Sequence, residues 1–234
     1  MCGCLHDYTL KTSDLKKVED ADVIIMNGLG IESFTDKILQ TNEKVQVIEA
    51  SQNLMLEDEM ANAHVWMNID YYISQVETVA EALKQYNPEN ADLYEKNKQE
   101  YKIKLQELKN EMIEKTRNKQ ESVISFSESL AYLENTMNLN ILTIETDHEH
   151  SSLSAEKLKE VIDYAKAQNI KKIMVDEFAS TQNAENLANE IDGRVYVLHS
   201  GLSGKEEKGA YEEMMRENLK IMEESLKNNI GKSP

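Results

Sequence analysis

Residues 22–50 read DVIIMNGLGIESFTDKILQTNEKVQVIEA, and this stretch decides the fold. It opens with an apolar run that ends at a turn signal, Asn27-Gly28, and this pattern predicts a buried strand. A helix is expected around Phe34 to Leu39, and residues 44–50 predict a second strand. A strand, a helix and a second strand at this spacing form a βαβ unit, so the sequence predicts a parallel sheet.

The glycines that follow the first strand, Gly28-Leu29-Gly30, have part of the pattern of a nucleotide-binding loop. The third glycine of the dinucleotide fingerprint and the Lys-Ser/Thr pair of a P-loop are both missing from the sequence. We therefore interpret this segment as an ordinary turn between a strand and a helix.

Helical patterns dominate the middle of the chain. Apolar residues recur at helical spacing over residues 76–83, and Asn87-Pro88 ends that helix. The next predicted helix covers residues 91–118, almost without glycine or proline, and would be about 40 Å long at 1.5 Å per residue. A helix of this length is best interpreted as a strut between two lobes. Near the start, Ser13-Asp14 is the expected N-cap of a short helix through Val18.

A second α/β half follows the long helix. It contains four predicted strands and three predicted helices, and Ser154 is the expected N-cap of one helix. The strands are predicted at 122–126, 139–144, 172–176 and 194–199, and the helices at 130–137, from Ser154 and from Ala210. We predict an α/β fold of two Rossmann-like lobes with parallel sheets, joined by a long rigid α-helix. The expected domains are residues 1–90 and 119–234, with the linking helix at 91–118.

Composition excludes several classes of function. The net charge is −17 with no basic patch, which argues against a nucleic-acid-binding protein, and the acidic surface mainly favours solubility. Cys2 and Cys4 are the two cysteines, and they lack the second pair that a zinc-binding motif needs. No apolar run is long enough to span a bilayer, and the start does not have the pattern of a signal peptide. Because the chain runs abruptly from Met1 into a motif, we expect N-terminal sequence to be missing.

The five histidines are the candidate metal ligands. Each is expected near the carboxyl end of a predicted strand, where parallel sheets collect their ligands, and none lies on a helix face. Imidazole nitrogen suits zinc, and four ligands would complete a zinc shell. The candidates are His6, His64, His148, His150 and His199.

Enzyme motifs are weak by comparison. Ser125, Ser127 and Ser129 are not part of a Gly-x-Ser-x-Gly elbow, and the sequence contains no His-Glu-x-x-His motif. A metal ion enclosed by protein ligands is bound rather than used in catalysis, because catalysis needs an open coordination position. We therefore expect a binding protein and not an enzyme.

Four motifs match those of a known protein family: His6-Asp7-Tyr8 leading into Ser13-Asp14, Asn27-Gly28-Leu29-Gly30, His64-Val65-Trp66 and Asn87-Pro88-Glu89-Asn90-Ala91. Through them the chain resembles, over nearly its whole length, the metal-binding substrate-binding proteins of ABC-type zinc and manganese uptake systems. The resemblance implies that both lobes contribute ligands to one divalent metal ion between them. His6 would be the first ligand and His64 the second, and an ABC-type membrane permease would receive the ion.

The resemblance also implies an extracytoplasmic protein, and we expect a monomer that binds zinc, with manganese as the alternative. The chain departs from the family in three places. The family's opening strand, helix and signal peptide are missing, its third ligand position holds Ser127, and its late aspartate falls at His199. His199 and one of His148 and His150 are then the candidates for the remaining ligands. The loop Asp147–His150 is alternatively a weak metal-collecting loop.

Other functions remain open at this point. A metal-binding adhesion or sensing protein would have the same fold, and an α/β enzyme would keep an open metal position. A truncated paralogue without tight metal binding is the last alternative.

Overall fold

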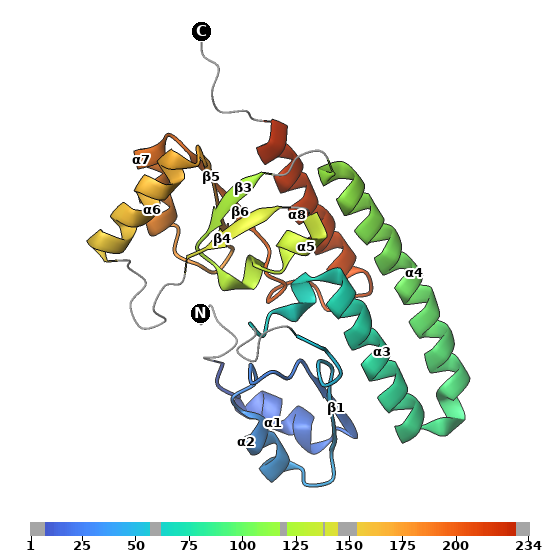
Figure 1. Cartoon of the computed structure of the whole chain (residues 1–234). Helices are drawn as coiled ribbons and strands as arrows, with labels where there is room; N and C mark the ends of the chain where they lie inside the picture. The colour runs from blue at the N-terminus through green and yellow to red at the C-terminus, as the bar shows by residue number, and fades with distance from the viewer. Residues whose placement is uncertain (1–7, 57–61, 118–120, 138, 145–153, 228–234) are drawn as a thin grey trace. The chain divides into compact units, whose positions relative to one another are not determined.

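The computed structural model describes residues 8–56, 62–117, 121–137, 139–144 and 154–227 (Figure 1). The chain forms two compact units, Met1–Gln106 and Glu107–Pro234. The first contains, in order, α1 (Thr12–Glu19), β1 (Val23–Met26), α2 (Thr35–Thr41), β2 (Gln46–Glu49), the 3₁₀ helix η2 (Val65–Met67), α3 (Ile69–Tyr86), η3 (Pro88–Asn90) and most of α4 (Ala91–Thr116). After the end of α4, the second contains β3 (Ser122–Ser125), η4 (Glu128–Leu130), α5 (Leu133–Met137), β4 (Asn140–Thr143), α6 (Ala155–Ala167), β5 (Lys172–Asp176), α7 (Gln182–Ile191), β6 (Arg194–Leu198) and α8 (Ala210–Lys227).

The predicted βαβ unit is present in the first unit. Strands β1 and β2 pair in parallel, with Val23 opposite Gln46 and Met26 opposite Glu49, and α2 lies between them in sequence. Their apolar side chains pack with α1 and α2 in a small core around Val18, Ile38 and Val45. Burial of these side chains is what holds the two short helices against the sheet.

The first helix begins earlier than the sequence analysis predicted. Ser13 and Asp14 lie inside α1, and Lys11 is the N-cap residue. The carboxylate of Asp14 reaches back to accept the backbone N–H of Lys11 at 2.8 Å and the hydroxyl of Tyr8 at 2.7 Å. Asp14 is the third residue of the helix, and its carboxylate gives the N–H of the N-cap residue a hydrogen-bond acceptor, as the acidic residue of a capping box does.

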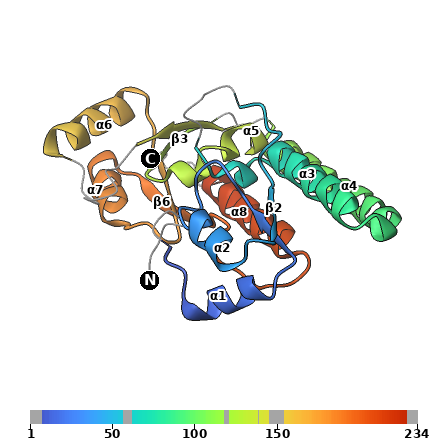
Figure 2. The ribbon, with the colours of Figure 1, turned by 90° about the horizontal axis from the view of Figure 1, so that it is seen from below.

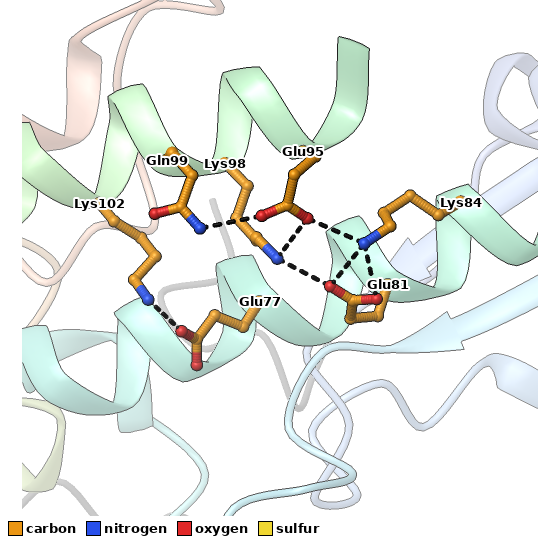
Figure 3. Close-up of polar contacts among 7 residues, drawn as sticks. All are labelled: Glu77, Glu81, Lys84, Glu95, Lys98, Gln99 and Lys102. Atoms are coloured by element: carbon orange, nitrogen blue, oxygen red, sulfur yellow. Dashed lines mark hydrogen bonds and ion pairs between the residues drawn. The ribbon is translucent and has the colours of Figure 1, made fainter. Parts of the chain in front are cut away.

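Helices α3 and α4 form a hairpin, and they lie side by side in both views (Figures 1 and 2). Asn68 caps α3, and Pro88 begins the short turn η3 between the helices. Two sets of side-chain contacts join the helices: a separate ion pair between Glu77 and Lys102, and a network made of Glu81, Lys84, Glu95, Lys98 and Gln99 (Figure 3). Hydrogen bonds from Gln99, and then from the two nearest lysines, lower the pKa of Glu95 to about 2. The predicted helix over residues 91–118 is confirmed as α4, which ends at Thr116.

The second unit contains a four-stranded parallel sheet in the order β4-β3-β5-β6. Helices α6 and α7 cover one face and α8 lies on the other (Figures 1 and 2). Alternate residues of the central strand β5, Ile173 and Val175, enter the core beneath α6 and α7, and both are fully buried. The predicted α/β fold with parallel sheets is confirmed.

The parallel register brings the carboxyl ends of the strands to one edge of this sheet. Asp176 at the end of β5 lies opposite Leu198 at the end of β6, and Ser125 ends β3. The segments that leave these strands therefore start close together, which is where ligands of parallel sheets are usually bound.

Helix α7 was not predicted. Its buried residues Ala184, Leu187, Ala188 and Ile191 have clear helical spacing, but the asparagines between them hid the pattern. Among the helices that the structure describes, none is both long enough and apolar enough to cross a membrane.

Candidate metal-binding site

His64 lies just before η2, and its side chain is almost completely buried. The Oδ1 atom of Asn62 accepts the backbone N–H of His64 at 2.9 Å and lies 2.7 Å from Nδ1 of the imidazole. Because an amide oxygen can only accept, Nδ1 must carry the hydrogen, and the lone pair of the neutral ring then lies on Nε2. Nε2 is therefore the atom through which His64 can bind a metal ion. The ring of Trp66 lies against the imidazole, with centroids 5.2 Å apart.

The backbone beside His64 is fixed by a buried network of amides. The Nδ2 atom of Asn27, which follows β1, donates to the carbonyl of Ala63 at 3.0 Å. The Nε2 atom of Gln75 on α3 donates to Oδ1 of Asn27 and to the hydroxyl of Ser51, both at 2.8 Å. Residues that follow β1 and β2, together with a residue of α3, thus fix the backbone of Ala63, which directly precedes His64.

The glycine turn after β1 is not an anion-binding loop. Gly28, Leu29 and Gly30 all have positive φ, the conformation that lets successive N–H groups point the same way. The carboxylate of Glu32 already accepts two N–H groups of the turn, those of Asn27 at 2.6 Å and Gly28 at 3.1 Å. The chain's own carboxylate thus occupies the place of a bound phosphate, which agrees with the interpretation of this segment as a turn.

In the second unit, the buried side chains of Ser127 and Ser129 form a cluster with the half-buried Asp176, which we call the serine cluster. The Ser127 hydroxyl donates to Oδ2 of Asp176, and the Ser129 hydroxyl lies 3.3 Å from the same oxygen. Oδ1 of Asp176 accepts the backbone N–H groups of Phe178 at 2.7 Å and Ala179 at 2.9 Å. The Ser127 hydroxyl is committed to this carboxylate, so it accepts in its 2.7 Å contact with the Ser129 hydroxyl, whose single hydrogen is shared between Ser127 and Asp176.

His199 directly follows β6, which ends at Leu198, so the prediction that His199 is the last strand residue is wrong by one position. Its N–H donates to Oδ1 of Asn218, and its carbonyl accepts from Nδ2 of the same side chain, both at 2.8 Å. Its side chain is 38% exposed and lies between two carboxylates. Nδ1 is 4.0 Å from Oε1 of Glu177, and Nε2 is 3.5 Å from Oε2 of Glu217.

The structure describes two of the five candidate ligands, His64 in the first unit and His199 in the second. His6, His148 and His150 lie outside the described residues. Within the described ranges, no three His, Cys, Asp or Glu side chains are grouped closely enough to hold a metal ion. The full set of five histidines therefore stays a prediction.

Four residues of these sites were missed by the sequence analysis: Asn62, Asp176, Glu177 and Glu217. Asp176 and Glu177 carried a usable signal, because they are acidic residues at the end of a predicted buried strand. Asn62 carried none, since an asparagine two residues before a histidine has many local roles.

Two α/β units with parallel sheets, with a buried His64 before η2 in the first and His199 directly after β6 in the second, agree with one class of protein, the metal-binding substrate-binding proteins. A family model identifies the family: residues 3–225 match the zinc-uptake complex component A periplasmic family, ZnuA. The chain belongs to this family, as its sequence motifs predicted. Proteins of this family are components of metal uptake systems.

Individual relatives agree with this assignment. The chain is 28% identical to the high-affinity zinc uptake system protein ZnuA of Bacillus subtilis (strain 168), covering 94% of this chain and 77% of that protein. It is 24% identical to the manganese-binding lipoprotein MntA of Halalkalibacterium halodurans, covering 92% and 75%. A crystal structure of ZnuA superposes with a TM-score of 0.84 at 26% identity, covering 96% of this chain and 88% of that chain. The relatives are thus named for either of two metals.

Proposed function

We propose that the chain is an extracytoplasmic binding protein that captures a divalent metal ion and delivers it to an ABC permease. The observation that carries the proposal is the contact between Asn62 and His64, which fixes the imidazole in one tautomer. Histidines that bind metals generally donate their other ring N–H to an oxygen acceptor in this way. Burial of the ring against Trp66 adds to the fixed orientation.

Zinc is the proposed metal, and manganese is the alternative. Imidazole nitrogen suits zinc, whereas manganese sites prefer carboxylate, carbonyl and water oxygens. The candidate donors of this chain are mainly histidines, which favours zinc. Both metals occur in the names of its relatives, so the choice needs a direct measurement.

For the ligands, we propose His64 and His199 among the described residues, and His6, His148 and His150 for the remaining positions. Ser127 is left out because its hydroxyl is bonded to Asp176 within the serine cluster. A shell closed by protein groups suits a carrier that acts as a monomer and not an enzyme.

The proposed domains are residues 1–90, the linking helix 91–118 and residues 119–234.

The test is zinc and manganese titration of the whole chain by calorimetry, with His64→Ala and His199→Ala in parallel. Gln52→Ala is the control, since Gln52 is an exposed residue of the first unit. We expect one zinc ion per chain, weaker manganese binding, and loss of tight binding in both histidine variants but not in the control.

Loss in only one variant would show that the other histidine is not a ligand. No binding by the parent chain would contradict the transport proposal and favour the truncated paralogue. An adhesion or sensing protein would bind metal equally well, and failure to stimulate a reconstituted permease would favour that alternative.

A further inference from the structure

The surroundings of His199 are unusual for an imidazole on a sheet edge. Glu177 faces its Nδ1 and Glu217 faces its Nε2, at 4.0 and 3.5 Å. Both distances exceed the usual range of an N–H···O hydrogen bond, 2.7 to about 3.2 Å. The imidazole thus has an anionic group near each nitrogen without a close hydrogen bond to either.

The two carboxylates differ in how firmly they are held. Oε2 of Glu177 accepts the backbone N–H of Ser200 at 2.7 Å, and Oε1 accepts the hydroxyl of Ser203 at 3.3 Å. The backbone N–H of Glu177 donates to Leu198, so β6 fixes its main chain as well. The Glu177 side chain is 16% exposed, whereas that of Glu217 on α8 is 49% exposed. Glu177 is the preorganised carboxylate, and it lies at the carboxyl edge of the sheet.

We infer that Glu177 and Nδ1 of His199 bind the same divalent cation, and that Glu217 accepts the hydrogen on Nε2 and orients the ring. This inference rests on the proposed function and adds a carboxylate to its ligands. Two ligands of a tetrahedral zinc ion, each about 2.1 Å from the metal, lie roughly 3.4 Å apart. The distance from Nδ1 of His199 to Oε1 of Glu177 is 4.0 Å, so a small side-chain rotation would bring the two atoms to the separation of two zinc ligands.

A carboxylate on the far nitrogen of a metal-bound imidazole fixes its tautomer and raises its basicity. Glu217 occupies that place. The carboxylates of Glu177 and Glu217 thus bring two negative charges close to a cation bound at His199. Further ligands would complete the coordination shell of the ion. Glu177 thereby supplies the oxygen donor that Ser127, bonded within the serine cluster, does not.

Glu177 also has a structural role, because it holds the turn from Ser200 to Ser203. Glu177→Gln separates the two roles, since the amide oxygen can still accept the Ser200 N–H while the negative charge is lost. A purely structural residue would tolerate this change. Glu224→Gln is the matched control, because it removes one negative charge from an exposed position on the same helix as Glu217.

The experiment uses the whole chain with zinc chloride. Long-range ¹H–¹⁵N NMR of the zinc-loaded chain identifies the metal-bound nitrogen of His199, and calorimetry measures the affinity of each variant. We expect zinc on Nδ1, a loss of affinity of at least tenfold in Glu177→Gln, and none in Glu224→Gln. Manganese binding should weaken more than zinc binding in Glu177→Gln, because an oxygen ligand is removed.

Zinc on Nε2 or an unchanged affinity of Glu177→Gln would each overturn the inference while leaving the proposed function in place. No zinc on His199 would overturn the inference and remove His199 from the proposed ligands, while the capture of zinc by the chain would stand. A parent chain that binds no zinc would overturn both.

Discussion

Replacing Asn62 with alanine tests the argument that the tautomer of His64 is set for metal binding. The change removes the acceptor that lies 2.7 Å from Nδ1, so the imidazole can place its hydrogen on either nitrogen and rotate. Loss of such an acceptor typically weakens metal affinity about 10- to 100-fold. At about 1.4 kcal/mol per factor of ten, the cost is roughly 1.4 to 2.8 kcal/mol of binding free energy. Asn62→Asp keeps an oxygen at the same place, so its affinity should equal or exceed that of the parent.

The assay is competition between each chain and a chromophoric zinc chelator at pH 7.5. Asn62→Ala also removes the contact with the backbone N–H of His64, which should cost about 1 kcal/mol of folding stability. Urea denaturation in a chelating buffer measures that part separately, and Gln52→Ala serves as the unaffected control. The reasoning is refuted if Asn62→Ala binds zinc as tightly as the parent, or if Asn62→Asp is as weak as Asn62→Ala.

Three further predictions concern folding. Asp176→Ala removes the carboxylate that accepts from Ser127, Phe178 and Ala179, and it should lower the free energy of unfolding by about 2–4 kcal/mol in urea, with a smaller loss in Asp176→Asn. Glu32→Ala should cost about 1–3 kcal/mol in the same assay, because two N–H groups of the glycine turn lose their acceptor; an unchanged midpoint would contradict this. The folded-state pKa of Glu95 is about 2, below its ordinary value of 4.5, so its stabilisation is present above pH 4.5 and lost as the pH falls towards 2. Melting curves of the parent and Glu95→Gln should therefore differ slightly at pH 7 and converge at pH 2, since the pair with its lysines is screened by solvent.

Much of the fold could be predicted from residues 22–50 and from the later apolar runs. The central strand β5 is buried on both faces and leaves a continuous apolar segment, whereas β1, predicted as a buried strand, has Ile25 exposed; the parallel arrangement follows from the helices between strands. The start of α1 could not be predicted, because Ser13 and Asp14 are equally good as caps or as first-turn residues. Only the contact of Asp14 with the Lys11 N–H decides between these roles.

The candidate site was predictable only in part. His64 and His199 could be singled out as candidates because histidines are few; His64 lies in a sequence motif, and His199 directly follows β6. The partners that decide what each imidazole can do, Asn62, Glu177 and Glu217, come from positions whose proximity depends on tertiary packing. For Ser127, the sequence indicated a poor ligand, and the bond to Asp176 supplies the physical reason.

In the proposed site, the two described histidines would bind a cation for different physical reasons. His64 is buried, and a neutral amide orients it, so its contribution depends on geometry and little on the solution. His199 is partly exposed between two carboxylates, so its attraction for a cation comes largely from charge. Salt screens exposed charges far more than buried dipoles, with a Debye length of about 10 Å at 0.1 M. Geometric selectivity should therefore come from the first unit, while the second unit supplies the charge that attracts a divalent ion.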